Sequence, residues 1–270
     1  MVVHLRSVAW RDGTNEGDGY PFAVPAIAAL RQAPLSFDRP VTFLVGENGS
    51  GKSTLLEAIA CAAGSIALGS APLGRDPSLA PARQLAATLK LTWRARTRTG
   101  FFLRAEDVFG FAKLVDRTRD ELEADRRVIA EDPALSDKAR GLGQMAYARE
   151  LAELRRRYGA GADARSHGET FLALFRDRLI PRGLFLLDEP EAPLSPLRQL
   201  ALLALLIEAS GPGESQFLVA THSPILMALP GATILSLDEG SVRPVAWDDL
   251  DHVRVTRQFL NDPEAFFRHL

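Results

Sequence analysis

The feature that most restricts the fold is a glycine-rich segment that joins a short apolar run to a helix. Residues 41–45 are apolar and β-rich, which predicts a buried parallel strand. The next segment, Gly46 to Thr54, fills every fixed position of the pattern G-x-x-x-x-G-K-[ST], and residues 53–63 favour a helix. Phosphate-binding loops require this order of strand, glycine loop and helix. The sequence therefore predicts a P-loop in an α/β domain.

The residue types of this loop predict its chemistry. Glycines allow backbone N–H groups to turn inward around phosphate oxygens, and the helix adds the positive end of its dipole. We expect Lys52 to reach the β- and γ-phosphates and the hydroxyl of Ser53 to ligate Mg²⁺. The expected nucleotide contacts are Asn48, Gly49, Ser50, Gly51, Lys52, Ser53 and Thr54. The alternative is a glycine turn that binds nothing. In that case the full pattern, the strand before it and the helix after it would all have arisen by chance.

A second apolar run, at residues 184–187, ends in two carboxylates. A carboxylate at the carboxyl end of a parallel strand faces the ligand crevice. We expect Asp188 to hold Mg²⁺, directly or through water, and Glu189 to polarise the water that attacks the γ-phosphate. The simpler alternative is a strand that leaves the core through a polar turn.

Two further segments are candidates for the same site. His222 follows a predicted strand at residues 216–220 and could reach a γ-phosphate, although a lone histidine at such a place is more often structural. Residues 166–169, Ser-His-Gly-Glu, form a capping box before an apolar helix. Capping alone accounts for this segment, but an exposed helix N-terminus can also receive a phosphate from a second subunit.

The remaining segments predict how the sheet is built. Further strands are expected at residues 2–10 and 233–237, an apolar helix at 196–209, a β-hairpin at 86–106, and charged helices over 108–158 with breaks at 132–133 and 141–143. Strands separated by helices imply a mainly parallel sheet with helices on both faces.

Composition limits the class of protein. With 270 residues, 46% hydrophobic residues and a net charge of -2, the chain is typical of a globular protein and has no overall attraction to nucleic acid or membrane. The single cysteine, Cys61, excludes an internal disulfide and is either a small core residue or a reactive thiol. The chain has neither a signal-peptide pattern nor the roughly 20 apolar residues of a membrane span. We expect a cytoplasmic protein without direct membrane insertion.

Together these motifs resemble those of the ABC-type ATPase superfamily. The chain shows a Walker A motif at 46–54, a signature-like segment at 166–169, a Walker B motif at 184–189 and a switch histidine at 222. Within the superfamily it is similar to the short bacterial AAA family ATPases related to SMC, RecF and OLD proteins. The segments that carry this closer resemblance are 46–57, 101–106, 188–195 and 259–263.

The resemblance implies one ABC-type ATPase domain over residues 1–270. Its parallel core sheet would be accompanied by an N-terminal antiparallel β portion and a helical subdomain inserted at about 108–180. ATP and Mg²⁺ would be the cofactors, and Glu189, His222 and Lys52 the catalytic residues. Two copies would form an ATP-dependent homodimer in which Ser166 and Gly168 of one subunit cap the γ-phosphate held by the other.

The chain departs from the transporter pattern in several places. The signature L-S-G-G-Q is here Arg-Ser-His-Gly-Glu at 165–169, and Ser195 stands where the D-loop usually has aspartate. No clear glutamine marks a Q-loop, for which Glu106 is the candidate. An aromatic residue that stacks on adenine should precede the P-loop, and Tyr20 and Phe22 are the candidates, unless either belongs to the core.

Three functions fit this pattern. The favoured one is an ATP-hydrolysing switch that acts in DNA metabolism or phage defence, with DNA or a protein as partner. The second is the ATPase subunit of a transporter, which the altered signature disfavours. The third is a non-catalytic ATP-dependent dimerisation module, which would not need Glu189. Arg94, Arg96, Arg98 and Arg104 form either a phosphate-binding face of the expected hairpin or part of a solvated charged surface.

Overall fold

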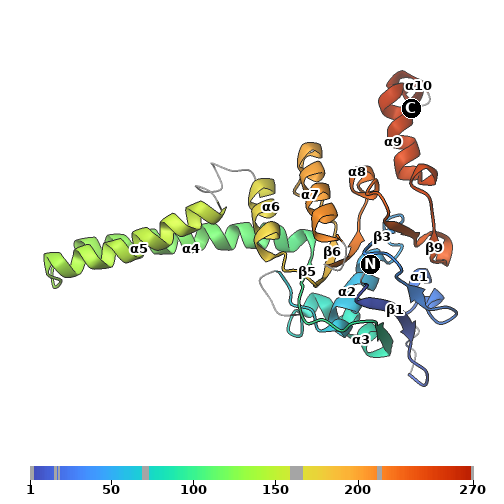
Figure 1. Ribbon diagram of the computed structural model, residues 1–270, viewed down its shortest axis with the longest axis horizontal. Helices are drawn as coiled ribbons and strands as arrows, with labels where there is room; N and C mark the ends of the chain where they lie inside the picture. The colour runs from blue at the N-terminus through green and yellow to red at the C-terminus, as the bar shows by residue number, and fades with distance from the viewer. Residues whose placement is uncertain are drawn as a thin grey trace.

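The protein forms two β-sheets with helices packed around them (Figure 1). This computed structural model describes residues 3–14, 17, 19–68, 73–158, 167–211 and 215–268. The larger sheet has the strand order β5 (Phe102–Leu103), β6 (Leu184–Asp188), β7 (Gln216–Ala220), β3 (Val41–Val45), β8 (Thr233–Ser236) and β9 (Arg243–Pro244). Its first five strands are parallel and β9 is antiparallel. The predicted α/β fold with a mainly parallel sheet is confirmed.

The smaller sheet is antiparallel, as expected for the N-terminal portion. It has the order β2 (Leu35–Ser36), β1 (Leu5–Trp10) and β4 (Leu89–Trp93). A buried glutamine at the start of β7 connects the two sheets. The Gln216 side chain accepts a hydrogen bond from the backbone N–H of Leu5 (2.7 Å) and donates one to the Leu5 carbonyl (2.9 Å). This clamp satisfies backbone groups of β1 that β2 is too short to pair.

The central strands are buried along their whole length, and their alternate side chains enter two apolar cores. One core contains Leu44 of β3 and lies against α2 (Lys52–Ala63) and α3 (Ala80–Thr88). The other contains Phe185 and Phe217, whose rings stack with centroids 5.0 Å apart. It lies against α6 (His167–Arg178), α7 (Pro196–Ala209) and α8 (Pro224–Met227). The two sets of helices cover opposite faces of the sheet (Figure 1).

The remaining helices extend from this body. Two long helices, α4 (Ala105–Glu131) and α5 (Asp137–Tyr158), lie side by side and reach away from the sheets (Figure 1). The short α1 (Pro25–Ala29) precedes β2, and the chain ends in α9 (Asp251–Asn261) and α10 (Pro263–Phe267). In the described part of the chain, no helix combines the length and the apolar character needed to pass through a bilayer.

The expected hairpin at 86–106 is wrong. Residues 86–88 end helix α3, strand β4 pairs with β1, and β5 enters the large sheet beside β6. The burial pattern explains the difference: β4 alternates between covered and exposed residues, whereas residues 101–103 are all buried. Continuous burial suits a parallel sheet covered on both faces.

The expected break at 141–143 is also absent, because α5 continues through both glycines. A Cβ placed on Gly143 would lie 2.9 Å from Cγ2 of Ile129, so glycine here permits close packing of α5 on α4. The other expected break is present, since α4 ends at Glu131 and α5 begins at Asp137.

Candidate functional site

The glycine loop between β3 and α2 needs glycine at defined positions. Gly46 has φ of 146°, and a Cβ there would lie 2.8 Å from both Asp238 Oδ1 and Ser50 Oγ. Gly51 has φ of 101°, and its Cβ would lie 2.6 Å from Cγ1 of Val24. Both the backbone conformation and the close neighbours exclude larger residues. The loop therefore has the tight turn that the sequence pattern predicts.

Lys52, the first residue of α2, is held over this loop. Its Nζ donates hydrogen bonds to the carbonyl of Gly46 (2.8 Å) and to that of Glu47 (3.0 Å), and the side chain is buried. Burial lowers the pKa of Lys52, while the nearby Glu189 and Asp188 act in the opposite direction. The ammonium group thus lies between the loop and the carboxylates at the end of β6.

Ser53 and Asp188 bring two oxygen ligands together from different elements. Ser53 Oγ donates a hydrogen bond to Asp188 Oδ1 at 3.0 Å. Burial raises the pKa of Asp188 to about 7, with the Ser53 hydrogen bond opposing this effect and Glu189 adding to it. A hydroxyl beside a buried carboxylate is the hard oxygen donor set that Mg²⁺ uses in nucleotide sites. These two residues therefore fit a magnesium ion.

Glu189 follows Asp188 in a backbone conformation unusual for this residue type. Its φ is 46°, in the left-handed region, and its backbone N–H donates to the Ala220 carbonyl at 2.9 Å. Strained residues held by neighbouring strands are often functional. The carboxylate Oε1 lies 4.0 Å from Nε2 of His222. The structure thus places the two predicted catalytic side chains together at the ends of β6 and β7.

His222 is held by two hydrogen bonds. Its backbone N–H donates to Glu191 Oε1 at 2.7 Å, and its ring Nδ1 lies 3.1 Å from Nε2 of His252. Its Nε2 is buried without a hydrogen-bond partner among the described residues. Burial lowers the pKa of His222, and the charges of Lys52 and His252 lower it further.

Sequence reasoning missed Asp238 and His252. Asp238 follows β8 and accepts hydrogen bonds from the backbone N–H of Glu47 (2.8 Å) and from the Ser236 hydroxyl (3.0 Å). It therefore supports the loop from the neighbouring strand. The available signal was a carboxylate after a buried strand, the same signal that identified Asp188.

The signature-like segment is described only in part. Ser166 lies outside the described residues, and so does the cap expected from it. Gly168 is buried in the first turn of α6, where a Cβ would lie 2.8 Å from the Pro193 carbonyl and 2.9 Å from Cδ of Arg198. Glu169 forms an ion pair with Arg198 at 2.7 Å. Glycine at 168 thus permits close packing on the segment after β6 of the same chain.

The two candidates for stacking on adenine, Tyr20 and Phe22, have different surroundings. Tyr20 is exposed and its hydroxyl lies 3.1 Å from Thr54 Oγ1, whereas the Phe22 ring packs against Trp10 with centroids 6.1 Å apart. Tyr20 is therefore the more exposed of these two candidates for stacking on adenine. Cys61 packs against the core, and burial raises its pKa, which agrees with the packing alternative rather than the reactive thiol.

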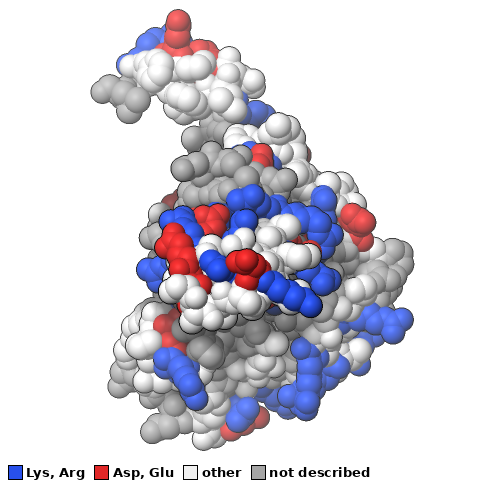
Figure 2. Space-filling view, turned by 90° about the vertical axis from the view of Figure 1, so that its left-hand side faces the viewer, with Lys and Arg blue, Asp and Glu red and all other residues white. Residues whose placement is uncertain are grey.

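Arg104 does not belong to an exposed basic face. It is buried and pairs with Asp76 (2.7 Å) and Asp107 (3.1 Å) at the start of α4. Arg94, Arg96 and Arg98 are exposed after β4. Toward the end of the α4–α5 pair, acidic and basic side chains lie among one another (Figure 2). The side chain of Glu106, the Q-loop candidate, lies outside what is described.

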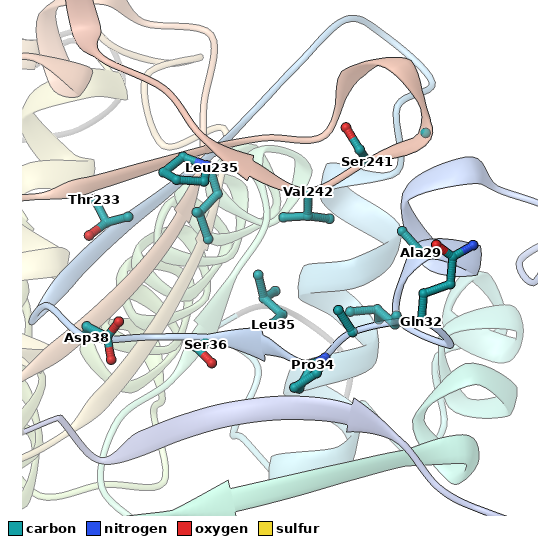
Figure 3. Close-up of a pocket in the computed structure, with 14 residues that line it drawn as sticks. Ala29, Gln32, Pro34, Leu35, Ser36, Asp38, Thr233, Leu235, Ser241 and Val242 are labelled. Atoms are coloured by element: carbon teal, nitrogen blue, oxygen red, sulfur yellow. The ribbon is translucent and has the colours of Figure 1, made fainter.

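Among the cavities near the large sheet, two border strands β8 and β9 or the P-loop. One of about 520 Å³ borders the P-loop residues Asn48 and Ser50 and reaches Arg243 and His252, a volume that suits a small ligand. The other, of about 430 Å³, lies between β2 and the β8–β9 region (Figure 3). Asp38 is the one charged side chain among its lining residues. The second cavity therefore lacks the cationic groups that a phosphate needs.

The fold and this site define a P-loop NTPase. Comparison with protein families agrees: a model described as "AAA domain" matches residues 26–128, and one described as "AAA domain, putative AbiEii toxin, Type IV TA system" matches residues 170–228. The first match contains the P-loop and the second contains Asp188, Glu189 and His222. These matches confirm the resemblance at the level of an AAA-type ATPase domain. No curated protein is found to match the chain.

Several solved structures are similar to the chain at low identity. "Structure of cbiO1 from clostridium perfringens: Part of the ABC transporter complex cbiONQ" matches with 16% identity and a TM-score of 0.47, covering 99% of this chain and 100% of that one. "An inward-facing conformation of a putative metal-chelate type ABC transporter" matches with 17% identity and a TM-score of 0.42, covering 81% and 77%. "SMC head domain from Thermotoga maritima" matches with 18% identity and a TM-score of 0.36, covering 90% and 100%.

Proposed function

We propose that the chain hydrolyses ATP and uses it as a reversible switch between monomer and homodimer. The observation that carries this proposal is the convergence of Lys52, Ser53, Asp188, Glu189 and His222 from three parallel strand ends and one helix start. A site that only binds nucleotide does not need Glu189 in a strained conformation beside a histidine.

Each residue has a role that its position supports. Lys52 would leave the loop carbonyls for the β- and γ-phosphates, and Asn48, Gly49, Ser50, Gly51 and Thr54 would complete the loop around the phosphates. Ser53 and Asp188 would hold Mg²⁺, which neutralises phosphate charge when bound. Glu189 would take the proton of the attacking water, and His222 would donate a hydrogen bond to the γ-phosphate.

The dimeric part of the proposal concerns Ser166 and Gly168. We infer a single ATPase domain over residues 1–270, with the helical subdomain at about 108–180 inserted before β6. Gly168 in the first turn of α6, and Ser166 two positions before it in the sequence, would face the γ-phosphate of a second copy, as the resemblance implies. ATP would then join two subunits, and hydrolysis would release them.

We propose that this switch acts in the cytoplasm, in DNA metabolism or phage defence. The match to a family model described as a toxin of a Type IV TA system supports the second.

The exposed Arg94, Arg96 and Arg98 are the residues with which DNA phosphates would pair. Retention on DNA that weakens with salt and is lost in the triple alanine variant would support a DNA partner; no retention at low salt would contradict it.

Nucleotide binding and hydrolysis are tested with Lys52→Ala. Loss of a charged hydrogen-bond donor to the phosphates is expected to weaken ATP binding about 10- to 100-fold and to reduce phosphate release with it. Binding is measured with a fluorescent ATP analogue, and phosphate release with Mg²⁺-ATP. Lys138→Ala, at an exposed position in α5, is the matched control. Wild-type phosphate release no greater than that of Lys52→Ala would refute the enzymatic function.

A further inference from the structure

A second histidine lies directly behind His222. His252 is in the first turn of α9, and its Nε2 is 3.1 Å from Nδ1 of His222, with ring centroids 5.1 Å apart. The two residues come from different elements, the loop after β7 and helix α9. In Figure 1, α9 extends from the body near α8. Helix α9 therefore contributes a side chain to the candidate nucleotide site.

The hydrogen bond between the two rings has a direction, because one nitrogen must carry the proton and the other must accept it. A neutral imidazole has one N–H and one bare nitrogen. If His222 donated from Nδ1, its Nε2 would direct a lone pair toward the Glu189 carboxylate 4.0 Å away. If His252 donates instead, Nε2 of His222 carries a hydrogen that faces this carboxylate favourably.

The surroundings of Nε2 favour the second arrangement. This atom is buried and has no hydrogen-bond partner among the residues described. The charged groups that act on the ring are Lys52 and Glu47 of the P-loop, Glu189 after β6 and His252 itself. Glu191 holds the backbone N–H. Burial lowers the pKa of His222, so the ring is neutral near pH 7 and its tautomer matters.

We propose that His252 is a positioning residue whose Nε2–H donates to Nδ1 of His222 and so fixes the tautomer that presents an N–H at Nε2. This inference rests on the proposed function, in which Nε2 of His222 donates to the γ-phosphate. With the opposite tautomer, Nε2 would present a lone pair to phosphate oxygens and could not bind them. The tautomer of His222 then depends on where α9 places His252. A site that can bind the γ-phosphate therefore requires α9 in this position.

The tautomer can be observed without measuring any activity. The chain has five histidines, so a ¹⁵N-histidine-labelled sample gives few signals, and the His222→Gln and His252→Gln variants assign two of them. Long-range ¹H–¹⁵N spectra at pH 7.5 distinguish rings protonated at Nε2 from rings protonated at Nδ1. We expect His222 to be protonated at Nε2 in the wild type and to become a mixture in His252→Leu. Protonation at Nδ1 in the wild type, or no change in the variant, would overturn the proposal.

Kinetic variants test whether this tautomer matters for turnover. We expect His252→Leu to lower kcat roughly 10- to 100-fold, the loss typical of a partner that orients a functional histidine, with KM for ATP nearly unchanged. In His252→Gln, the amide nitrogen lies near the former Nε2 and can still donate, so kcat should recover most of this loss. His252→Asn, whose amide is too short to reach, should resemble leucine. Equal rates in the Gln and Asn variants would contradict the proposal.

Two controls separate the possible failures. Thr256→Leu changes an exposed residue one turn further along α9 and should leave kcat unchanged. Thermal unfolding measurements identify any variant that does not fold. If the leucine variant does not fold, the kcat of His252→Gln is used to test the proposal. If the wild type releases no phosphate, the proposed function fails while the spectra still decide the tautomer. If the wild type releases phosphate but His222 is protonated at Nδ1, the proposed function stands and only the positioning role of His252 is refuted.

Discussion

Glu189→Gln is expected to lower the rate of phosphate release by about 10³-fold and to leave ATP binding intact, because general base catalysis contributes roughly 10² to 10⁴ in rate. The amide keeps the size and polarity of the side chain but cannot take a proton from water. Lys52 and Ser53 are unchanged and should still hold the nucleotide. The variant should therefore accumulate the ATP-bound state, which in the proposed switch is a dimer.

This outcome is measured in two ways. Phosphate release in a single turnover gives the chemical rate, and light scattering after a sizing column gives the mass with and without Mg²⁺-ATP. Glu208→Gln, at an exposed position in α7, is the matched control and should behave as the wild type. Unchanged turnover in Glu189→Gln would exclude it as the base. A variant that binds ATP but stays monomeric would exclude the sandwich of two subunits.

The sequence predicts the centre of this site well, because each of its motifs is local. The P-loop needs a strand, glycines and a helix start within a few residues, and Asp188 and Glu189 directly follow an apolar strand. Since parallel strands place their carboxyl ends at one edge, the order of motifs already implied that they meet. The structure brings them together as expected, with Ser53 Oγ 3.0 Å from Asp188 Oδ1.

What the sequence could not predict depends on contacts between distant segments. His252 meets His222 only because α9 begins where the loop after β7 passes, and no pattern in α9 indicates this. The prediction of a β-hairpin at residues 86–106 was wrong because alternation of apolar and polar residues does not show which sheet a strand joins. The buried pairing of Arg104 with Asp76 likewise joins segments on either side of α3 and β4. Such pairings are fixed by tertiary packing rather than by local preference.

Asp188→Asn is expected to make the nucleotide-free protein more stable at pH 8. Burial raises the pKa of Asp188 to about 7 in the folded protein, from an ordinary value of 3.8. Between these two values the unfolded chain has lost the proton and the folded chain has kept it. The unfolded state therefore binds fewer protons, and stability falls as pH rises through this window. At pH 8 the wild type has therefore lost about 4 kcal/mol of its free energy of unfolding, because each unit of difference in pKa corresponds to 1.36 kcal/mol.

The asparagine variant removes this penalty because it stays neutral, and its Oδ1 can still accept the hydrogen bond from Ser53. Urea unfolding in EDTA should therefore give it a higher free energy of unfolding than the wild type at pH 8, with the difference shrinking toward pH 4. Asp177→Asn, an exposed carboxylate in α6, should show no such pH dependence. A constant difference between wild type and Asp188→Asn from pH 4 to 8 would show that Asp188 is already ionised when folded.

The same titration should appear with the opposite sign in magnesium binding. A cation requires the ionised carboxylate, so Mg²⁺-ATP must displace the Asp188 proton below pH 7. Its affinity for the wild type is then expected to rise from pH 5.5 to pH 7.5, and Asp188→Asn should bind Mg²⁺-ATP weakly at every pH. The burial that destabilises the nucleotide-free chain above pH 7 would thus couple magnesium binding at Asp188 to the loss of its proton.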